Sequence, residues 1–522
     1  MSHGRRQLIF SFGFLLILLL NASIAYSQDA QERSISTSIA GMEQLLMSEK
    51  ILINTVERYV EELQAKVNSL KNLVTVLKTE NDKALQDPEK YLHNPLNGFS
   101  LIRRMHNDWN NIELFMAKPV GESYIEVIKK YRHEMPTTND ISEASEAIHR
   151  LQTTYDMKID DVVKGILNGK QYDAKLSAVD CYFMGLHLFA KKSYYQAGFW
   201  LYNAIELYEN SDYNKIIDYG LDKPNALYGE VLVKQLRFND ALIVLKKASS
   251  LRPNDAALLS RKNEIELQTK TYTGAPISYP KPNPTAYEKG CRGQYVNIPS
   301  NLYCIYNTTT SAFLRLAPLK MELLQLEPYM VLFHDIISDK EILDLQKLAR
   351  PNLKRATVFS KTEGKSQIVE KRTSKFSWFQ DNTSQTTIRL NQRIRDMTGF
   401  DIEGSEMLQV MNYGLGGHYD THFDYFNVSD TADIVKLNGN RIATVLFYMS
   451  DVEQGGATVF PNIRTAVFPR KGTAVMWYNL DNKVEGDWRT LHAACPVIVG
   501  SKWVCNKWIR SKAQIFRKPC YI

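Results

Sequence analysis

Four side chains that can bind a metal alternate along one short run of this sequence. Residues 411–426 read Met-Asn-Tyr-Gly-Leu-Gly-Gly-His-Tyr-Asp-Thr-His-Phe-Asp-Tyr-Phe. Because successive side chains of a β-strand point to opposite faces, the two histidines and two aspartates would share one face. They are His418, Asp420, His422 and Asp424. A rise of ~3.3 Å per residue puts the two groups of each His-x-Asp pair about 7 Å apart along the strand, where both can reach one ion. The residues leave open which pair does so.

A third ligand must come from elsewhere, and His492 is the candidate. Two histidines and one carboxylate on one side of an ion leave coordination positions open, which is typical of non-haem iron(II) oxygenases. Lys502 follows further along the chain. If the chain reverses near Val497, His492 and Lys502 face each other on neighbouring strands. The lysine could then bind the distal carboxylate of a 2-oxo acid cosubstrate as a point charge.

Two other classes of protein could use these residues. A zinc hydrolase with two histidines and an aspartate would need a general-base carboxylate beside the metal and would have no use for Lys502. A non-catalytic, peptide-binding subunit with a silent domain would be favoured if any ligand were missing, but all of them are present. We therefore predict an oxygenase.

The region that contains these residues has the sequence pattern of a β-rich domain. After about residue 325, short β-rich runs alternate with Gly, Pro and Asn turns, at 442–449, 457–460, 473–478 and 503–509. Such spacing predicts an all-β barrel or a double-sheet jelly roll, that is, a double-stranded β-helix. Residues 339–350 and 385–398 are predicted helices that could pack on its outside. We place the catalytic domain at 328–520.

The N-terminal half is predicted to be helical. Apolar residues recur at spacings of three and four, which favours a coiled coil over about four heptads. They are Ile53, Val56, Val60, Leu63, Val67, Leu70, Val74 and Leu77. Another helix must cover this seam, either in a hairpin of the same chain or in a second chain. We favour self-association and assign residues 28–150 to a dimerisation domain.

Residues 176–255 contain a degenerate helical repeat, within a peptide-binding domain that we place at 155–258. Gly185, Ala197 and Ala204 recur at the same spacing as Gly229, Ala241 and Ala248, which matches the small-residue skeleton of a tetratricopeptide helix pair. The first unit is rich in aromatic residues, which would be either core residues or a surface on which a proline-rich peptide in polyproline II form stacks. The candidates are Tyr194, Tyr195, Phe199 and Tyr202, together with Tyr228 of the second unit. Residues 259–327 are predicted to be a linker.

The first 27 residues are predicted to be a signal peptide, with Arg5 and Arg6 before the apolar run 8–20. We therefore expect a protein of an oxidising lumen without a later membrane span, where the six cysteines can form disulfides in any of 15 full pairings. Sequons at Asn307, Asn382 and Asn427 could carry glycans, although a glycan at the last would crowd the site. The net charge of +7 has no basic block, so nucleic acid is not implied.

Residues 328–520 resemble the catalytic domain of animal collagen prolyl 4-hydroxylase α subunits, which are iron- and 2-oxoglutarate-dependent dioxygenases. The coiled coil and the tetratricopeptide pair also occur in that family, in the same order. The matching runs include Asn412-Tyr413-Gly414, His422-Phe423-Asp424, Gly439-Asn440-Arg441-Ile442-Ala443-Thr444, Phe447-Tyr448-Met449-Ser450-Asp451-Val452, Gly455-Gly456-Ala457-Thr458-Val459-Phe460-Pro461, Lys471-Gly472-Thr473-Ala474, His492-Ala493-Ala494-Cys495-Pro496-Val497 and Lys502-Trp503-Val504.

The resemblance implies a particular site. It places the iron on the second His-x-Asp pair, His422 and Asp424, together with His492, and it puts the phenol of Tyr413 and the amine of Lys502 near the oxo acid. It also implies two disulfides and leaves two cysteines over. The implied pairs are Cys291–Cys304 and Cys495–Cys520, and the remaining cysteines are Cys181 and Cys505.

The activity implied by the resemblance is 4-hydroxylation of peptidyl proline in procollagen, with Fe(II), 2-oxoglutarate, dioxygen and ascorbate, in the lumen of the endoplasmic reticulum. The implied partner is protein disulfide isomerase, as the β subunit of an α2β2 tetramer. One departure affects the substrate: Tyr228 is the only aromatic residue in the second repeat's helix at 226–233, where collagen-type subunits present several tyrosines. The peptide could thus be collagen-like or another proline-rich chain. The domain order argues against lysyl hydroxylation.

Overall fold

The computed structural model describes residues 38–296, 302–356, 358–359, 366–367, 372–426 and 432–517. It divides into two compact units, Gly41–Thr137 and the rest of the chain. The predicted signal peptide lies outside the described residues, as do Asn427 and Cys520. Among the described helices, none combines the length and the apolar character needed to cross a membrane.

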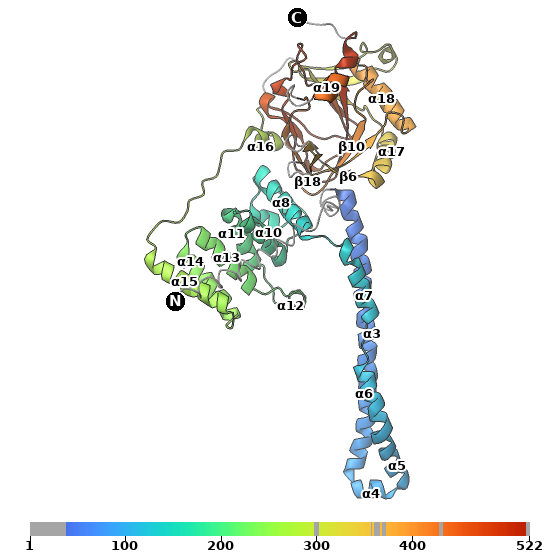
Figure 1. Ribbon diagram of the computed structural model, residues 1–522, viewed down its shortest axis with the longest axis vertical. Coiled ribbons are helices and arrows are strands. Elements are labelled where there is room, and N and C mark those ends of the chain that lie inside the picture. The colour runs from blue at the N-terminus through green and yellow to red at the C-terminus, as the bar shows by residue number, and fades with distance from the viewer. Residues whose placement is uncertain are drawn as a thin grey trace. The chain divides into compact units, whose positions relative to one another are not determined.

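The smaller unit is a long helical hairpin. Helices α6 and α7 run back alongside α3, and Lys66 on α3 donates hydrogen bonds to the carbonyl oxygens of Met116 and Lys118, at 2.9 and 2.6 Å (Figure 1). This hairpin covers the apolar seam only in part: Ile53, Val60 and Val74 remain 53%, 55% and 60% exposed. The helices are α3 (Ile39–Gln86), α4 (Pro88–His93), α5 (Pro95–Arg103), α6 (Trp109–Ala117) and α7 (Glu122–Tyr131).

The larger unit begins with helices that pack in pairs. In each pair a glycine lets the helices approach closely: a Cβ atom on Gly185 would come within 2.5 Å of Leu201, and one on Gly229 within 2.6 Å of Leu245. In both predicted repeats, a glycine thus allows the two helices of the pair to pack closely. The helices are α8 (Thr138–Thr154), α9 (Ile159–Val163), α10 (Ala178–Ala190), α11 (Tyr194–Glu206), α12 (Asp212–Ile216), α13 (Asp222–Lys234), α14 (Phe238–Leu251), α15 (Ala256–Thr271) and α16 (Ala286–Cys291). A two-stranded hairpin, β1 (Ile166–Leu167) and β2 (Lys170–Gln171), follows α9.

The rest of the unit is built on two antiparallel sheets. The larger has the order β3-β4-β5-β16-β12-β19-β10-β9-β6 and the smaller β11-β17-β14-β15. The strands of the larger sheet are β3 (Cys304–Asn307), β4 (Leu319–Gln325), β5 (Met330–His334), β6 (Lys354–Arg355), β9 (Lys375–Phe379), β10 (Leu408–Tyr413), β12 (Arg441–Tyr448), β16 (Ala474–Tyr478) and β19 (Lys502–Arg510). Those of the smaller are β11 (Tyr419–His422), β14 (Thr458–Phe460), β15 (Thr465–Val467) and β17 (His492–Ala494). Two short pairs complete the domain, β7 (Val358–Phe359) with β8 (Ser366–Gln367) and β13 (Gln454–Gly455) with β18 (Val497–Val499).

Each face of the larger sheet is buried against a different partner. One face packs on the smaller sheet, through a core that includes Leu446, Trp477, Phe460 and Ala494. The other face packs on helices α17 (Asp339–Ala349) and α18 (Gln385–Thr398), whose apolar side chains join a second core. Both helices lie at the positions predicted from the sequence. A third helix, α19 (Ala432–Asn438), precedes β12.

The structure corrects two predicted domain boundaries. The segment 259–327 is not a linker throughout: α15 and α16 lie within or across it, and β3 and β4 form one edge of the large sheet. The linker was predicted from the prolines earlier in this segment. The alternation of Leu319, Met321 and Leu323 is the strand pattern that indicates β4 instead. The N-terminal helical unit also ends at Thr137, so α8 belongs to the unit that contains the sheets.

Candidate metal centre

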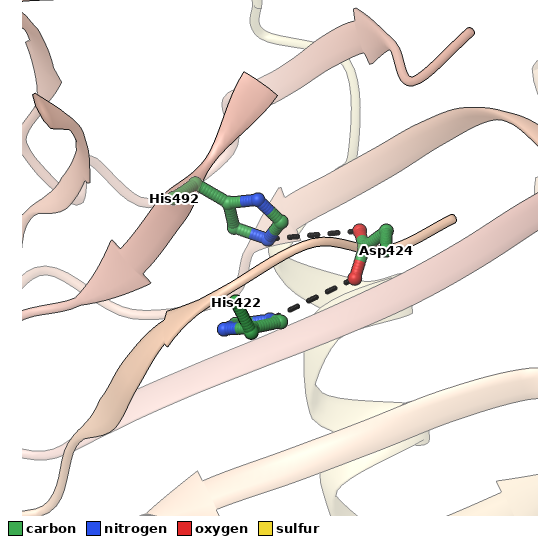
Figure 2. A group of neighbouring side chains, drawn as sticks. All are labelled: His422, Asp424 and His492. Atoms are coloured by element: carbon green, nitrogen blue, oxygen red, sulfur yellow. Dashed lines mark ion pairs between the residues drawn. The ribbon is translucent and has the colours of Figure 1, made fainter. Parts of the chain in front are cut away.

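Three side chains converge from β11, the segment that follows it, and β17. His422 ends β11 and lies opposite His492, the first residue of β17. Asp424 follows two positions after His422, and its carboxylate oxygens lie 3.7 Å from His422 Nε2 and 3.6 Å from His492 Nε2 (Figure 2). One ligand atom from each residue lies within 4.8 Å of the others. Two imidazole nitrogens and one carboxylate oxygen around a common point fit an iron(II) ion that keeps open positions.

The first His-x-Asp pair does not join this group. His418 is 3% exposed, and its Nε2 lies 3.2 Å from Asp420 Oδ1, so the pair binds within itself. The predicted shared face fails for a local reason. His418 precedes β11, and the pairing with β17 shifts register between Tyr419 and His422. A bulge of this kind breaks the alternation of faces.

Backbone carbonyl groups hold both imidazoles in place. His422 Nδ1 lies 2.7 Å from the carbonyl oxygen of Asp420, and His492 Nδ1 lies 2.9 Å from that of Thr490. Each Nδ1–H can donate to its carbonyl, which leaves both Nε2 atoms free to bind the ion. The Tyr419 ring stacks on the His422 ring, with centroids 3.6 Å apart. Both rings are therefore fixed before any ion binds.

The carboxylate of Asp424 is oriented by a buried hydrogen-bond chain that the sequence did not reveal. Thr444 on β12 donates its hydroxyl proton to Asp424 Oδ2 at 2.7 Å, and Asn479 donates to the Thr444 hydroxyl at 2.9 Å. Arg441 also donates to the backbone carbonyl of Asp424 at 3.2 Å. Thr444 lies inside a run that matched the family pattern, but nothing in its residue type distinguishes it from a structural strand threonine.

The surroundings keep two of the three ligands in the protonation states that bind a metal. Burial lowers the pKa of His422 to about 3, and the proximity of His492 acts in the same direction. Burial alone would raise the pKa of Asp424, but charge interactions with His492 and His422 outweigh it and hold this pKa at about 2. At neutral pH the His422 imidazole is therefore neutral and the Asp424 carboxyl is ionised, as metal binding requires.

Lys502 faces the same cavity from the other sheet. It is the first residue of β19 and 1% exposed; its Nζ donates to the carbonyl oxygen of Gly456 at 2.7 Å and lies 5.0 Å from the centre of the Tyr413 ring. One cavity is lined by both of these side chains and by the three metal-ligand candidates. Burial lowers the pKa of Lys502 to about 7. A bound carboxylate would favour its charged form.

The path between His492 and Lys502 differs from the prediction. The two residues were expected on neighbouring strands, but β17 belongs to the small sheet and β19 to the large one. Strand β18 and Gly500, whose φ is +110°, lie between them. Because glycine alone adopts such a backbone conformation easily, the chain can cross from one sheet to the other here. The two side chains thus face each other across the cavity rather than along a ladder.

The predicted peptide-binding aromatics separate into two groups. On α11, Tyr195, Phe199 and Tyr202 are 43%, 43% and 49% exposed. Tyr194 and Tyr228 are half-buried and pack against the hydrophobic core of the helical repeats. Of the five predicted residues, only the first three are therefore largely exposed in this structure.

The cysteine pairing that the resemblance implied is wrong. Cys291, at the end of α16, is bonded to Cys495, directly after β17. This bond excludes both Cys291–Cys304 and Cys495–Cys520, and it forms because α16 packs beside β14, the neighbour of β17. Cys304 is an exposed free thiol, while burial raises the pKa values of the free thiols Cys181 and Cys505 to about 12.

The two remaining sequons differ in accessibility. Asn307 is 6% exposed, and its amide nitrogen donates to the hydroxyl of Thr310 at 2.8 Å. The Asn307 amide is therefore little accessible in the folded chain, and Asn307 stays a predicted site. Asn382 is exposed in the loop before α18 and stays a predicted site.

Thr444, next to the metal site, gives a direct test of how the Asp424 carboxylate is positioned. Replacing Thr444 by valine keeps the shape of the side chain but removes the hydroxyl that donates to Asp424. We expect the affinity for iron(II), or for Mn(II) as a stand-in, to fall roughly 10- to 100-fold, as is usual when a group that orients a metal ligand is lost. Titration of the metal measures this directly. Thr473→Val is the control, because this buried hydroxyl donates to the carbonyl of Arg470 instead; equal losses in both variants would contradict the assigned role.

Known proteins resemble both parts of the chain. Residues 38–169 match the family described as the N-terminal region of the prolyl 4-hydroxylase alpha subunit, and residues 408–510 match the 2OG-Fe(II) oxygenase superfamily. The second match contains all three metal-ligand candidates and Lys502.

Curated relatives align over nearly the whole chain. Human prolyl 4-hydroxylase subunit alpha-1 is 34% identical, and the alignment covers 96% of this chain and 98% of the human protein. Prolyl 4-hydroxylase subunit alpha-2 of Gallus gallus is 34% identical, with 97% and 98% covered. Prolyl 4-hydroxylase subunit alpha-2 of Caenorhabditis elegans is 36% identical, with 97% and 96% covered.

Proposed function

The chain belongs to the family of prolyl 4-hydroxylase α subunits, and on this premise we propose that it hydroxylates peptidyl proline at C4 with Fe(II), 2-oxoglutarate and dioxygen. The observation that carries the proposal is the cavity that holds His422, Asp424 and His492 together with the buried amine of Lys502. A silent, peptide-binding subunit would have no need to keep this full set of groups in one pocket.

Each group in the cavity has a distinct role in the proposed reaction. His422, Asp424 and His492 hold the iron, which when bound supplies the oxidative decarboxylation of 2-oxoglutarate and the hydroxylation of the proline. Lys502 binds the distal carboxylate of 2-oxoglutarate by charge, and the Tyr413 phenol lies beside it. The apolar side chains of Trp477 and Phe460, which pack around His492, limit the access of water to the reacting atoms.

We further interpret the two-sheet domain as a double-stranded β-helix and the paired helices as tetratricopeptide repeats that bind a proline-rich or collagen-like peptide. Tyr195, Phe199 and Tyr202 support this interpretation, because their exposed rings suit stacking on proline. The half-exposed valines of α3 support self-association of two α chains. By family resemblance we also propose the use of ascorbate, an assembly with protein disulfide isomerase, and a location in the endoplasmic reticulum lumen.

The reaction class can be tested on the whole chain co-expressed with protein disulfide isomerase. Incubation with (Pro-Pro-Gly)10, Fe(II), 2-oxoglutarate and ascorbate is expected to give peptide-dependent succinate, and 4-hydroxyproline detected by mass spectrometry. A chelator should abolish turnover, and Fe(II) but not Zn(II) should restore it, because zinc has no redox chemistry. A lysine-containing peptide without proline is the control substrate. Oxidation of lysine, or full activity with zinc, would overturn the proposal.

A further inference from the structure

A proline-rich segment of the chain lies against the helical repeats. It joins α15 to α16 and forms neither helix nor strand (the trace between these helices in Figure 1). We call residues 276–284 the strap; they read Pro-Ile-Ser-Tyr-Pro-Lys-Pro-Asn-Pro. Its composition resembles that of the peptides that the proposed function assigns to the exposed aromatic face of α11.

The first contact of the strap is made through its backbone. The amide of Ile277 donates a hydrogen bond to the carbonyl oxygen of Gln235 at 3.0 Å. The side-chain amide of Gln235 in turn donates to the carbonyl oxygen of Tyr194 at 2.8 Å. Gln235 therefore fixes the strap at the point where α13 ends and α11 begins. A main-chain hydrogen bond of this kind is what an extended peptide ligand uses to align itself on a protein.

The second contact is aromatic and lies on the predicted peptide surface. The ring of Tyr279 stacks on that of Tyr195, with centroids 5.2 Å apart and planes 27° apart. Tyr195 in turn packs edge-to-face with Phe199, at 5.1 Å. We call Tyr195 and Phe199 the aromatic shelf. One of its two rings is already stacked by a residue of the strap, although both remain 43% exposed.

The third contact is an ion pair beyond the shelf. Lys281 Nζ lies 2.6 Å from Asp156 Oδ2, and the two side chains are 73% and 42% exposed. Exposed pairs of this kind contribute little to stability. The strap thus rests on one backbone hydrogen bond, one ring stack and one weak ion pair, with most of its residues exposed. Such a segment can be displaced without disturbing the core.

Both ends of the strap are firmly held. Upstream, Ile265 of α15 is fully buried in the core that it forms with α13 and α14. Downstream, α16 is tied to the β-sheet domain by the Cys291–Cys495 disulfide, and Arg292 donates to the carbonyl oxygen of Thr154 at 2.7 Å. Tethering gives a ligand a high effective concentration at its site even when each contact is weak.

We propose that the strap is an internal competitor of proline-rich peptides for the aromatic shelf. This inference rests on the proposed function, because it concerns the peptide-binding face of the same enzyme. In the free enzyme Tyr279 occupies the Tyr195 ring. A long proline-rich chain that engages the shelf takes the place of Tyr279, whereas a short peptide that reaches only the metal centre does not have to displace it. The strap thereby lowers the affinity of peptides that engage the shelf and leaves the binding of peptides that reach only the metal centre unchanged.

Binding of poly-L-proline to the iron-free full chain tests the competition. Tyr279→Ala is expected to lower the dissociation constant about three- to tenfold in isothermal titration, because the shelf no longer has an internal occupant. Lys281→Ala should act in the same direction by a smaller factor, and Tyr195→Ala should weaken binding. Tyr303→Ala is the matched control, since this tyrosine is 61% exposed and lies outside the strap. Unchanged or weaker binding by Tyr279→Ala would overturn the proposal, as would the absence of binding in every variant.

Hydrogen exchange gives a second reading that does not depend on any substitution. Saturating poly-L-proline should raise the exchange rate of the Ile277 amide in the wild-type chain, because its hydrogen bond to Gln235 is broken. An unchanged rate despite bound peptide would show that the strap stays in place and would contradict competition. Peptide-dependent succinate release is then measured on the same preparations after Fe(II), 2-oxoglutarate and ascorbate have been added. Tighter binding by Tyr279→Ala without any turnover would support the strap proposal and contradict the proposed function. Turnover without competition would support the proposed function and contradict the strap proposal.

Discussion

Replacing His492 by alanine is expected to abolish peptide-dependent succinate release, with a loss beyond roughly 100-fold, because even groups that only orient a metal ligand account for 10- to 100-fold. The imidazole supplies one of the three donor atoms that lie within 4.8 Å of one another. Two donors cannot hold the ion in the cavity at ordinary iron concentrations. Metal content after dialysis and turnover at several iron concentrations measure the two losses separately. Imidazole added to the variant should restore part of the bound metal.

The other histidine of the same run provides a matched control. His418 is as buried as His492 but pairs with Asp420 and lies outside the donor group. His418→Ala is therefore expected to keep its metal and to retain turnover within about threefold of the wild type, allowing for a modest loss of stability. If His418→Ala lost its metal and His492→Ala kept it, the assignment of the iron to the second His-x-Asp pair would be wrong.

The second large effect is expected on 2-oxoglutarate. Lys502→Met keeps the length and apolar stem of the side chain but removes the charge. A hydrogen bond to a charged group contributes about 1.5–3 kcal/mol, so KM for 2-oxoglutarate should rise roughly 10- to 150-fold, while metal content stays unchanged. Lys507→Met is the control, because this lysine is buried on the same strand but pairs with Asp381 at 2.7 Å. Equal effects of both substitutions would contradict a specific role for Lys502.

The pH dependence of KM for 2-oxoglutarate shows whether Lys502 acts through its charge or through its shape. Burial lowers the pKa of Lys502 to about 7 in the free protein, so the amine is charged below that pH and neutral above it. Binding of the dicarboxylate requires the charged form. KM for 2-oxoglutarate is therefore expected to rise by up to about tenfold per pH unit above pH ~7, and the slope should disappear in Lys502→Met. A flat wild-type profile between pH 7 and 9 would show that the amine stays charged when free.

The sequence predicts the metal ligands and the cation for the oxo acid better than it predicts how the strands that hold them are connected. His492 and Lys502 could be chosen by residue type and spacing, because an oxygenase needs a third ligand and a cation for the oxo acid. The choice between the two His-x-Asp pairs could not be made from alternation, because the register shift between Tyr419 and His422 breaks it. Helices 339–350 and 385–398 were predictable because each has a regular apolar face and a capping serine, Ser338 or Ser384.

Contacts between segments far apart in the sequence were beyond prediction. Thr444 on β12 donates to Asp424 in the segment after β11, and no local signal in the sequence marks that contact. The pairing of Cys291 with Cys495 depends on where α16 packs. The strap is similar: its prolines predicted a linker, which is what they form, but its stacking on α11 depends on how α15 directs the chain.

The Cys291–Cys495 bond has a consequence for the synthesis of the protein. Its two cysteines are 204 residues apart, and Cys495 comes three residues after the metal-ligand candidate His492. During translation, Cys291 emerges long before its partner exists, so the bond can close only on a chain that already contains all three ligand residues and nearly the whole β-sheet domain. In a chain that terminates before residue 495, Cys291 lacks this partner. Oxidation of this pair thus marks a chain whose translation has passed the last metal ligand.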